Sequence, residues 1–166
     1  RSQSHAKHFS AEFRKNSAFP HKFFIVGKSG GEYKEQILKE LASAGLEKEV
    51  DFLGYVDDSE LAFLYQHAAA LLFVTLREGF GMPIVEAMYF GAPVITSDVS
   101  ALREIAGEAA LLVDPLSPSA IGEAMRSVVG NPDLRRKMIQ SGTMRAKGFS
   151  WEAHFRTIAE VVQRLA

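Results

Sequence analysis

Five short runs of apolar, β-prone residues constrain the fold of this chain more than any other feature. Helical patterns separate these runs, which have four to seven residues each: Lys22–Val26, Val50–Leu53, Ala69–Thr75, Pro93–Thr96 and Ala110–Val113. Short strands that alternate with helices predict a parallel sheet covered on both faces, because each parallel connection needs a crossover helix. We therefore expect a three-layer α/β domain with a mostly parallel sheet of about five strands.

The helical segments begin and end with recognisable signals. Asp57-Asp-Ser-Glu60 forms a capping box, in which side chains satisfy free N–H groups at the start of a helix. Residues 1–18 are basic and place Ala6, Phe9 and Phe13 at helical spacing, which predicts a helix with a narrow apolar face. The last helix starts near Trp151, and we assign that tryptophan to core packing.

Composition excludes several classes of function. The 166 residues, 47% of them hydrophobic, suffice for the core of one domain. A net charge of −1 creates no field that would attract nucleic acid, and the absence of cysteine excludes thiolate metal sites and a cysteine nucleophile. His5 and His8 lie three residues apart but have no third ligand nearby, so we expect no metal. No apolar run reaches the roughly 18 residues of a membrane-spanning helix.

The segment Thr75–Glu86 carries the chemistry of a binding site. It joins the third predicted strand to a helix, with glycines at positions 79 and 81 and Pro83 in the first helical turn. Free N–H groups and the helix dipole favour an anion at such a helix start. Glu78 and Glu86 flank the turn, and ionised carboxylates accept hydrogen bonds from hydroxyl groups. The combination predicts a ligand that carries both phosphate and hydroxyl groups, such as a sugar nucleotide.

Two nucleotide-binding motifs match this chain only in part. Gly27-Lys28-Ser29 has the end of a P-loop, but Lys22 occupies the position of the first glycine, so a phosphate cradle is not expected. Gly79 and Gly81 match two positions of a dinucleotide fingerprint, and Ile84 replaces the third glycine. An NAD site is therefore a weak alternative.

The two glutamates allow other interpretations when their sequence is considered alone. They are compatible with the acid–base pair of a glycosidase. In such an enzyme the distance between the two carboxyl groups determines whether the anomeric configuration is inverted or retained, and the sequence does not give that distance. They are also compatible with a purely structural role, because a carboxylate near a helix N-terminus contributes roughly 0.3–1 kcal/mol to stability. These alternatives stay open at the level of residue pattern.

A family resemblance favours one interpretation. The segments Glu78–Met88 and Gly91–Asp98 resemble the signature of group 1 retaining glycosyltransferases of the GT-B type, including their Glu-x₇-Glu spacing. The resemblance extends from about residue 20 to the end of the chain. Further segments match in order: Phe24–Gly27, Phe52–Val56, Ala110–Pro115 and Phe149–Trp151. It implies that residues 1–166 form a single domain, the Rossmann-like C-terminal, donor-binding half of a GT-B fold.

The resemblance also implies roles for individual residues. Glu78 would contact hydroxyls of the donor sugar and would be the catalytic group, and Glu86 would bind the ribose. Backbone N–H groups of the loop and helix start would meet the sugar and diphosphate, and the base would lie near Tyr55 and Val56. The implied donor-binding residues are Glu78, Gly79, Phe80, Gly81, Met82, Pro83, Ile84, Glu86, Val56 and Tyr55.

The activity implied by the resemblance is retaining transfer of a hexose from a UDP-, GDP- or ADP-sugar to a glycan or lipid acceptor. It needs neither a cofactor nor a metal. The resemblance implies a cytoplasmic protein, with the inner face of the membrane as a second location through peripheral association of the full-length protein.

The chain also departs from the family pattern. Nothing before Phe23 resembles the extra strand and the Arg–Lys pair with which the family's domain opens, and Arg14-Lys15 lie late in the first predicted helix. Ser100-Ala101 replace small glycines of many relatives, and no acceptor-binding domain is recognised. We therefore expect the 166 residues alone to be inactive as a transferase. A non-catalytic nucleotide-binding or interaction module of the same fold is the alternative.

Overall fold

The computed structural model describes residues 20–28 and 31–149. These residues form five parallel strands in two sheets. β1 (Phe23–Val26) pairs with β2 (Val50–Gly54), and β4 (Val94–Ser97) lies between β3 (Leu71–Phe73) and β5 (Ala110–Val113). The expected α/β class and the parallel strands are confirmed, but the strands form a pair and a triplet rather than one continuous sheet.

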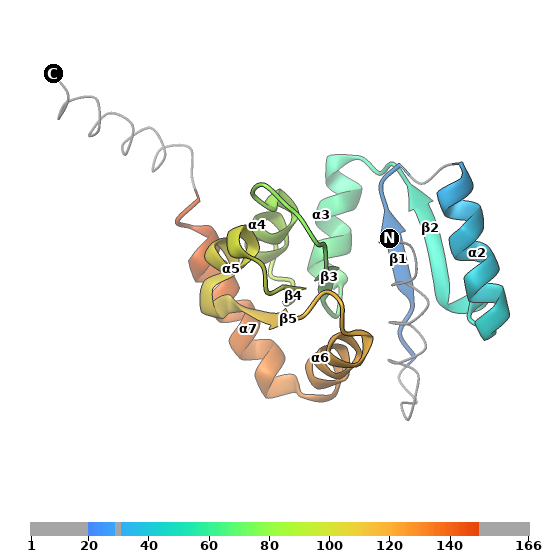
Figure 1. The fold of residues 1–166 in the computed structure, drawn as a ribbon. Helices are drawn as coiled ribbons and strands as arrows, with labels where there is room; N and C mark the ends of the chain where they lie inside the picture. Colours follow the sequence, from blue (N-terminus) through green and yellow to red (C-terminus); the bar gives the residue numbers. More distant parts are fainter. Residues whose placement is uncertain (1–19, 29–30, 150–166) are drawn as a thin grey trace, which may run out of the picture.

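Six α-helices connect or follow these strands in the described part of the chain. Their bounds are α2 Glu32–Ala44, α3 Asp58–His67, α4 Met82–Tyr89, α5 Ser100–Ala106, α6 Pro118–Gly130 and α7 Pro132–Ala146. Short 3₁₀ turns occupy Glu47–Glu49 and Gly107–Ala109. Figure 1 shows β1, β2 and α2 at one side, β3–β5 with α4–α7 at the other, and α3 between them. The helices expected over residues 1–18 and from Trp151 onward lie outside the described residues.

Three helices, α3, α6 and α7, begin at side-chain caps that the sequence contains. The Asp57 carboxylate accepts a hydrogen bond from the Glu60 N–H at 2.8 Å, and the Glu60 carboxylate accepts one from the Asp57 N–H at 3.0 Å. The predicted capping box is therefore confirmed. The Ser117 and Asn131 side chains cap α6 and α7 by accepting hydrogen bonds from N–H groups of the first turn, without a reciprocal bond, and a proline follows each cap. Local chemistry thus fixes where these helices begin.

Three groups of buried side chains form the core. One lies between the β3–β5 sheet and helices α3, α4 and α5, and includes Ile84, Met88 and Leu102. A second covers the other face of that sheet with α6 and α7, and a third packs α2 onto β1 and β2. Phe23 contacts both the second and the third group, so it links the two sheets. The predicted three-layer arrangement is thereby confirmed for the β3–β5 sheet.

The β1–β2 sheet differs from the expectation of helices on both faces. Phe24 is 53% exposed and Leu53 is 39% exposed, on the face opposite α2. Within residues 20–28 and 31–149, β1 pairs only with β2 and β3 pairs only with β4. Apolar alternation predicts which residues form strands, but strand pairing depends on contacts between distant segments. This is why the division into two sheets was not predicted.

None of the helices in the described part of the chain is long and apolar enough to cross a membrane.

Candidate functional site

The β3–α4 loop, residues 74–81, starts beside the carboxyl end of β4. β3 and β4 pair in register with Phe73 opposite Thr96, so their ends meet at one edge. The Thr75 N–H donates to Ser97 Oγ at 2.8 Å, and Thr96 Oγ1 donates to the Phe73 carbonyl at 2.8 Å. Thr96 and Ser97 are fully buried. These two hydroxyls therefore fix the position at which the loop leaves the sheet.

Gly81 ends the loop in a conformation that requires glycine. Its φ is +89°, in the left-handed region, and it stands immediately before α4. A Cβ at this position would lie 2.7 Å from Leu102 Cδ2 and 3.3 Å from Ile84 Cδ1. Leu102 belongs to α5 and is fully buried. The left-handed backbone and the close approach of Leu102 on α5 thus both favour glycine at the start of α4.

Gly79 stands in a different environment from Gly81. A Cβ there would meet no heavy atom within 4 Å. The sequence placed both glycines in the predicted anion-binding loop, but contacts within the protein restrict the residue type only at Gly81. Open space beside Gly79 leaves room on the outer side of the loop.

The N–H groups of the loop and helix start fall into two sets. Ile84 N–H donates to the Gly81 carbonyl at 2.9 Å, Gly79 N–H donates to Glu78 Oε1 at 3.0 Å, and Pro83 has no N–H. No hydrogen bond with another described residue occupies the N–H groups of three successive positions: Phe80, Gly81 and Met82. Because α4 lacks a side-chain cap, these groups can bind an anion.

The two glutamates of the site lie in different surroundings. Glu78 is exposed, and its contact with the Gly79 N–H is local. Glu86 lies on α4, is half-buried, and accepts a hydrogen bond at Oε2 from the Tyr65 hydroxyl at 3.3 Å. Glu78 thus lies within the loop, and Glu86 lies in the helix that follows it. Only Glu86 is tied to another element.

Tyr65 was not recognised as a site residue from the sequence, where it was one of several apolar positions of α3. It is 8% exposed, and burial, the Glu86 charge and their hydrogen bond raise the pKa of its hydroxyl above the ordinary value. The available signal was the phenol itself, because a tyrosine on a buried helix face usually has a polar partner.

The apolar residues predicted at the donor site differ in accessibility. Phe80 and Met82 are exposed, Pro83 is half-buried and Ile84 is fully buried. The Phe80 ring lies edge-to-face with Phe149, with ring centroids 6.0 Å apart. Ile84 packs in the core and its N–H is already bonded, so it supports the helix start rather than offering a group to a ligand.

Helix α5, which supplies the Leu102 contact, is fixed at both ends. Asp98 accepts a hydrogen bond from Arg103 Nε at 2.6 Å beside its first turn. At its last turn, the Arg145 guanidinium of α7 donates to the carbonyls of Glu104 and Ile105. These contacts stabilise the position of α5, whose Leu102 side chain lies next to Gly81.

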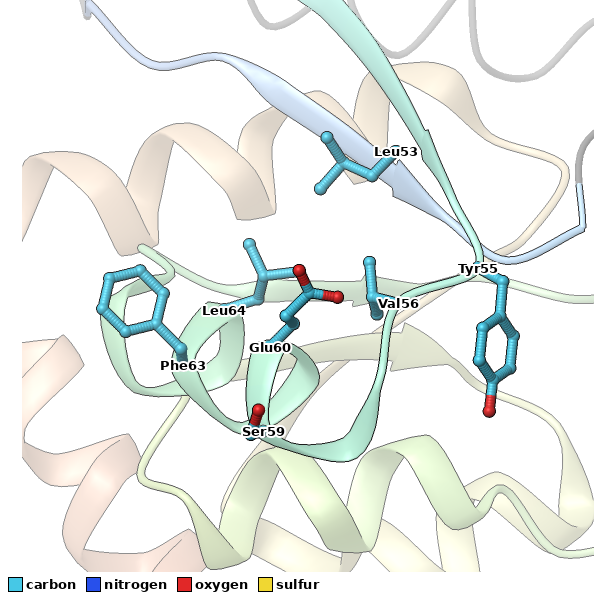
Figure 2. Close-up of a pocket in the computed structure, with 7 residues that line it drawn as sticks. All are labelled: Leu53, Tyr55, Val56, Ser59, Glu60, Phe63 and Leu64. Atoms are coloured by element: carbon cyan, nitrogen blue, oxygen red, sulfur yellow. The ribbon is translucent and has the colours of Figure 1, made fainter.

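Tyr55 and Val56, the predicted base-binding residues, follow β2. They line a cavity of about 510 Å³ between β2 and α3, together with Leu53, Ser59, Glu60, Phe63 and Leu64. Figure 2 shows the Tyr55 ring directed away from α3, whereas Leu53 and Leu64 lie on facing sides of the cavity. The lining contains no residue of the β3–α4 loop. This cavity therefore joins Tyr55 and Val56 to α3 and not to the loop.

Among the residues that the structure describes, no group of three or more histidine, cysteine, aspartate or glutamate side chains is arranged to hold a metal ion. His5 and His8 lie outside those residues.

Comparison with known proteins identifies the family. Residues 4–145 match the model of the glycosyl transferases group 1 family, which is more than half of the chain. The chain belongs to the group 1 glycosyltransferases. The family expected from the Glu-x₇-Glu segment is thus confirmed.

Individual relatives of this glycosyltransferase chain agree with that assignment. It is 36% identical over 121 residues to O-antigen chain mannosyltransferase B of Escherichia coli, a match that covers 72% of this chain and 32% of the relative. Sucrose-phosphate synthase from Thermosynechococcus elongatus superimposes with a TM-score of 0.81 at 26% identity, covering 99% of this chain and 43% of the synthase.

A second solved structure, Anabaena HepE in complex with UDP and glucose, superimposes with a TM-score of 0.84 at 18% identity. This match covers 98% of our chain and 45% of HepE, and it supports the fold alone. The glycosyltransferase chain thus spans less than half the length of these three relatives. Its fold is the Rossmann-like half of a GT-B architecture.

Proposed function

We propose that this chain is the donor-binding domain of a retaining glycosyltransferase, and that the β3–α4 loop binds the diphosphate of a nucleotide sugar. One observation carries this proposal: the N–H groups of Phe80, Gly81 and Met82 have no hydrogen-bond partner among the described residues, and they lead into α4 between Glu78 and Glu86 in the chain. Such N–H groups and the helix dipole stabilise phosphate charge. Carboxylates do not bind phosphate, but they accept hydrogen bonds from sugar hydroxyls.

The proposed contacts follow the chemistry of each group. The diphosphate lies against the N–H groups of Phe80, Gly81 and Met82, and Glu86 accepts hydrogen bonds from the ribose. Glu78, which is exposed and borders the loop, accepts hydrogen bonds from the donor sugar. The base lies towards Tyr55 and Val56.

Catalysis in this proposal is electrostatic. As the bond between the sugar and the diphosphate breaks, negative charge grows on the departing phosphate oxygens, and the preorganised loop N–H groups stabilise it. Neither Glu78 nor Glu86 needs to gain or lose a proton. No metal or other cofactor is required. The sugar passes from the nucleotide diphosphate to the acceptor with retention of its anomeric configuration.

The identity of the donor and acceptor is supported by relatives. A mannosyltransferase at 36% identity favours a hexose as the transferred sugar, and we propose that UDP, GDP or ADP carries it. The acceptor would be a glycan or a lipid, and the full-length protein would work in the cytoplasm, peripherally at the inner face of the membrane. Because an acceptor needs groups beyond this donor loop, we propose that the 166 residues bind the donor without transferring it.

Calorimetric titration of the chain with UDP, GDP, ADP and NAD tests the proposal. We expect one nucleoside diphosphate to bind more tightly than NAD, and Glu86→Gln to weaken that binding by about tenfold, which corresponds to loss of a hydrogen bond to a charged group. Glu123→Gln, an exposed change on α6, is the matched control. Tighter binding of NAD, or undiminished binding by Glu86→Gln, would contradict the assignment.

Turnover tests the role of Glu78. In the full-length protein, Glu78→Ala should lower kcat at least about tenfold, or about 1.4 kcal/mol of barrier, because the sugar loses a contact at the reacting end. The same change should reduce diphosphate binding far less. An unchanged kcat would remove Glu78 from the site.

A further inference from the structure

Tyr65 combines a rigid position with a polar group directed at the site. Its ring belongs to the core group that includes Ile84 and Ala87, and it stacks on Phe90 with centroids 6.2 Å apart and planes at 14°. A ring packed in this way leaves the hydroxyl little freedom, because its position follows from two side-chain torsions. The hydroxyl donates to Glu86 Oε2 across the boundary between α3 and α4.

The Glu86 side chain is free to adopt several orientations unless a partner holds it. Its side chain has three rotatable bonds and is half-buried beside the loop. The hydrogen bond from Tyr65 uses one carboxylate oxygen, and Oε1 accepts no hydrogen bond from another described residue. An ionised carboxylate has about four acceptor positions, so most of its capacity remains for a ligand. Holding one oxygen therefore orients the other.

We propose that Tyr65 is a positioning residue for donor recognition: its hydroxyl fixes the Glu86 carboxylate in the orientation that accepts hydrogen bonds from both ribose hydroxyls. This inference rests on the proposed function and deepens it. Tyr65 touches neither the donor nor the reacting atoms. It acts through Glu86, by reducing the freedom that the carboxylate loses when a ribose binds.

The proposal has a consequence for specificity. A carboxylate held in one orientation discriminates a ribose from a 2′-deoxyribose, because the deoxy sugar leaves an oriented acceptor without its donor. A freely rotating carboxylate can turn to the single hydroxyl that remains, and the discrimination falls. The ratio of UDP to 2′-deoxy-UDP affinity therefore reports on Tyr65 in a manner that overall stability does not.

The experiment uses the nucleoside diphosphate that binds in the titration above, written here as UDP, and its 2′-deoxy form. It measures Kd for both ligands with the unaltered chain, Tyr65→Phe, Glu86→Ala and the double variant. Tyr65→Phe keeps the packed ring, and we expect about three- to tenfold weaker UDP binding with a smaller change for 2′-deoxy-UDP. In the Glu86→Ala background the same change should have no effect on either ligand. Tyr89→Phe, which alters the exposed tyrosine of α4, is the matched control and should leave both constants unchanged.

The outcomes separate the two proposals. If Tyr65→Phe weakens both ligands equally, or still weakens UDP in the Glu86→Ala background, its effect comes from packing and the positioning role is wrong. If UDP binding depends on Glu86 but not on Tyr65, only the positioning role fails. If the chain binds none of UDP, GDP and ADP, or binds them without regard to Glu86, both the proposed donor site and the positioning role fail. Near-ultraviolet circular dichroism verifies that each variant keeps its packing.

Discussion

The two sheets of this domain differ in how completely they are packed. The β3–β5 sheet has helices on both faces and holds the fully buried Leu102, Ile95 and Ile84 in its core groups. The β1–β2 sheet is covered by α2 on one face and exposes Phe24 and Leu53 on the other. The candidate phosphate and ribose groups belong to the fully packed part, and the candidate base-binding residues to the open part. The comparison suggests that the loop is preorganised, whereas the position of the base is less constrained.

The largest expected effect comes from a core truncation that compares the two sheets directly. Leu102→Ala should lower the free energy of unfolding by about 3–5 kcal/mol, because it leaves a cavity beneath the loop. Leu53→Ala removes the same atoms from the open face and should cost less than about 1.5 kcal/mol. Urea unfolding of both variants provides the measurement. Equal losses would show that the open face is covered in solution.

The next effect concerns the two glycines of the loop. Gly81→Ala should cost about 2–4 kcal/mol, since it combines a left-handed backbone with a Cβ placed 2.7 Å from Leu102. Gly79→Ala, which enters open space, should change stability by less than about 0.5 kcal/mol. Thermal unfolding followed by calorimetry separates them. A large loss for Gly79→Ala would mean that the loop is constrained along its whole length.

A smaller effect should follow from the buried hydroxyl at the end of β4. Ser97→Ala leaves the Thr75 N–H without its acceptor and should cost about 1–2 kcal/mol, with weaker nucleotide binding because the loop loses its fixed origin. Ser119→Ala, on the exposed first turn of α6, should lie within about 0.5 kcal/mol of the unaltered chain. Chemical unfolding and UDP titration check both values. Unchanged stability in Ser97→Ala would show that the Ser97 hydroxyl does not hold the loop to β4.

The smallest effect concerns α3, which joins the two sheets. Hydrogen bonds from the Ser59 hydroxyl and the Glu60 N–H hold the pKa of the Asp57 carboxyl below its ordinary value of 3.8. A lowered pKa in the folded state contributes stability that is present above pH 3.8 and is lost as the pH falls through the folded value. The Tm difference between the chain and Asp57→Asn should therefore shrink as the pH is lowered from 5 towards 2. A constant difference would contradict this role.

Short-range chemistry made much of the fold predictable. The capping box of Asp57 and Glu60, the prolines at helix starts and the alternating strands each depend on residues a few positions apart, so the sequence alone indicates them. The division of the strands into two sheets depends on pairing between distant segments and was not visible.

The same limit applies to the site. Glu78 and the glycines of the β3–α4 loop, and Glu86 in the helix that follows, lie close together in the chain and were predicted as a unit. Tyr65 lies 21 residues before Glu86, and Ser97 lies 22 residues after Thr75. Nothing in the local pattern marks these partners, because the fold alone brings their side chains together. Leu102 was missed for the same reason, although its contact favours glycine at position 81.

The hydrogen bond from the Gly79 N–H to Glu78 Oε1 occupies one donor of the β3–α4 loop with the loop's own carboxylate. If a diphosphate bound at the Phe80, Gly81 and Met82 N–H groups also reached the Gly79 N–H, it would replace a charge-assisted hydrogen bond instead of adding one, so this extra contact would contribute little net affinity. Such a phosphate would displace the Glu78 carboxylate, which carries the same sign of charge. Glu78 would then turn away from the loop and bond to another hydrogen-bond donor. In the proposed complex that donor is a sugar hydroxyl. Binding of the diphosphate would thereby free Glu78 to accept a hydrogen bond from the sugar. A diphosphate without a sugar would leave the Glu78 carboxylate in contact with water.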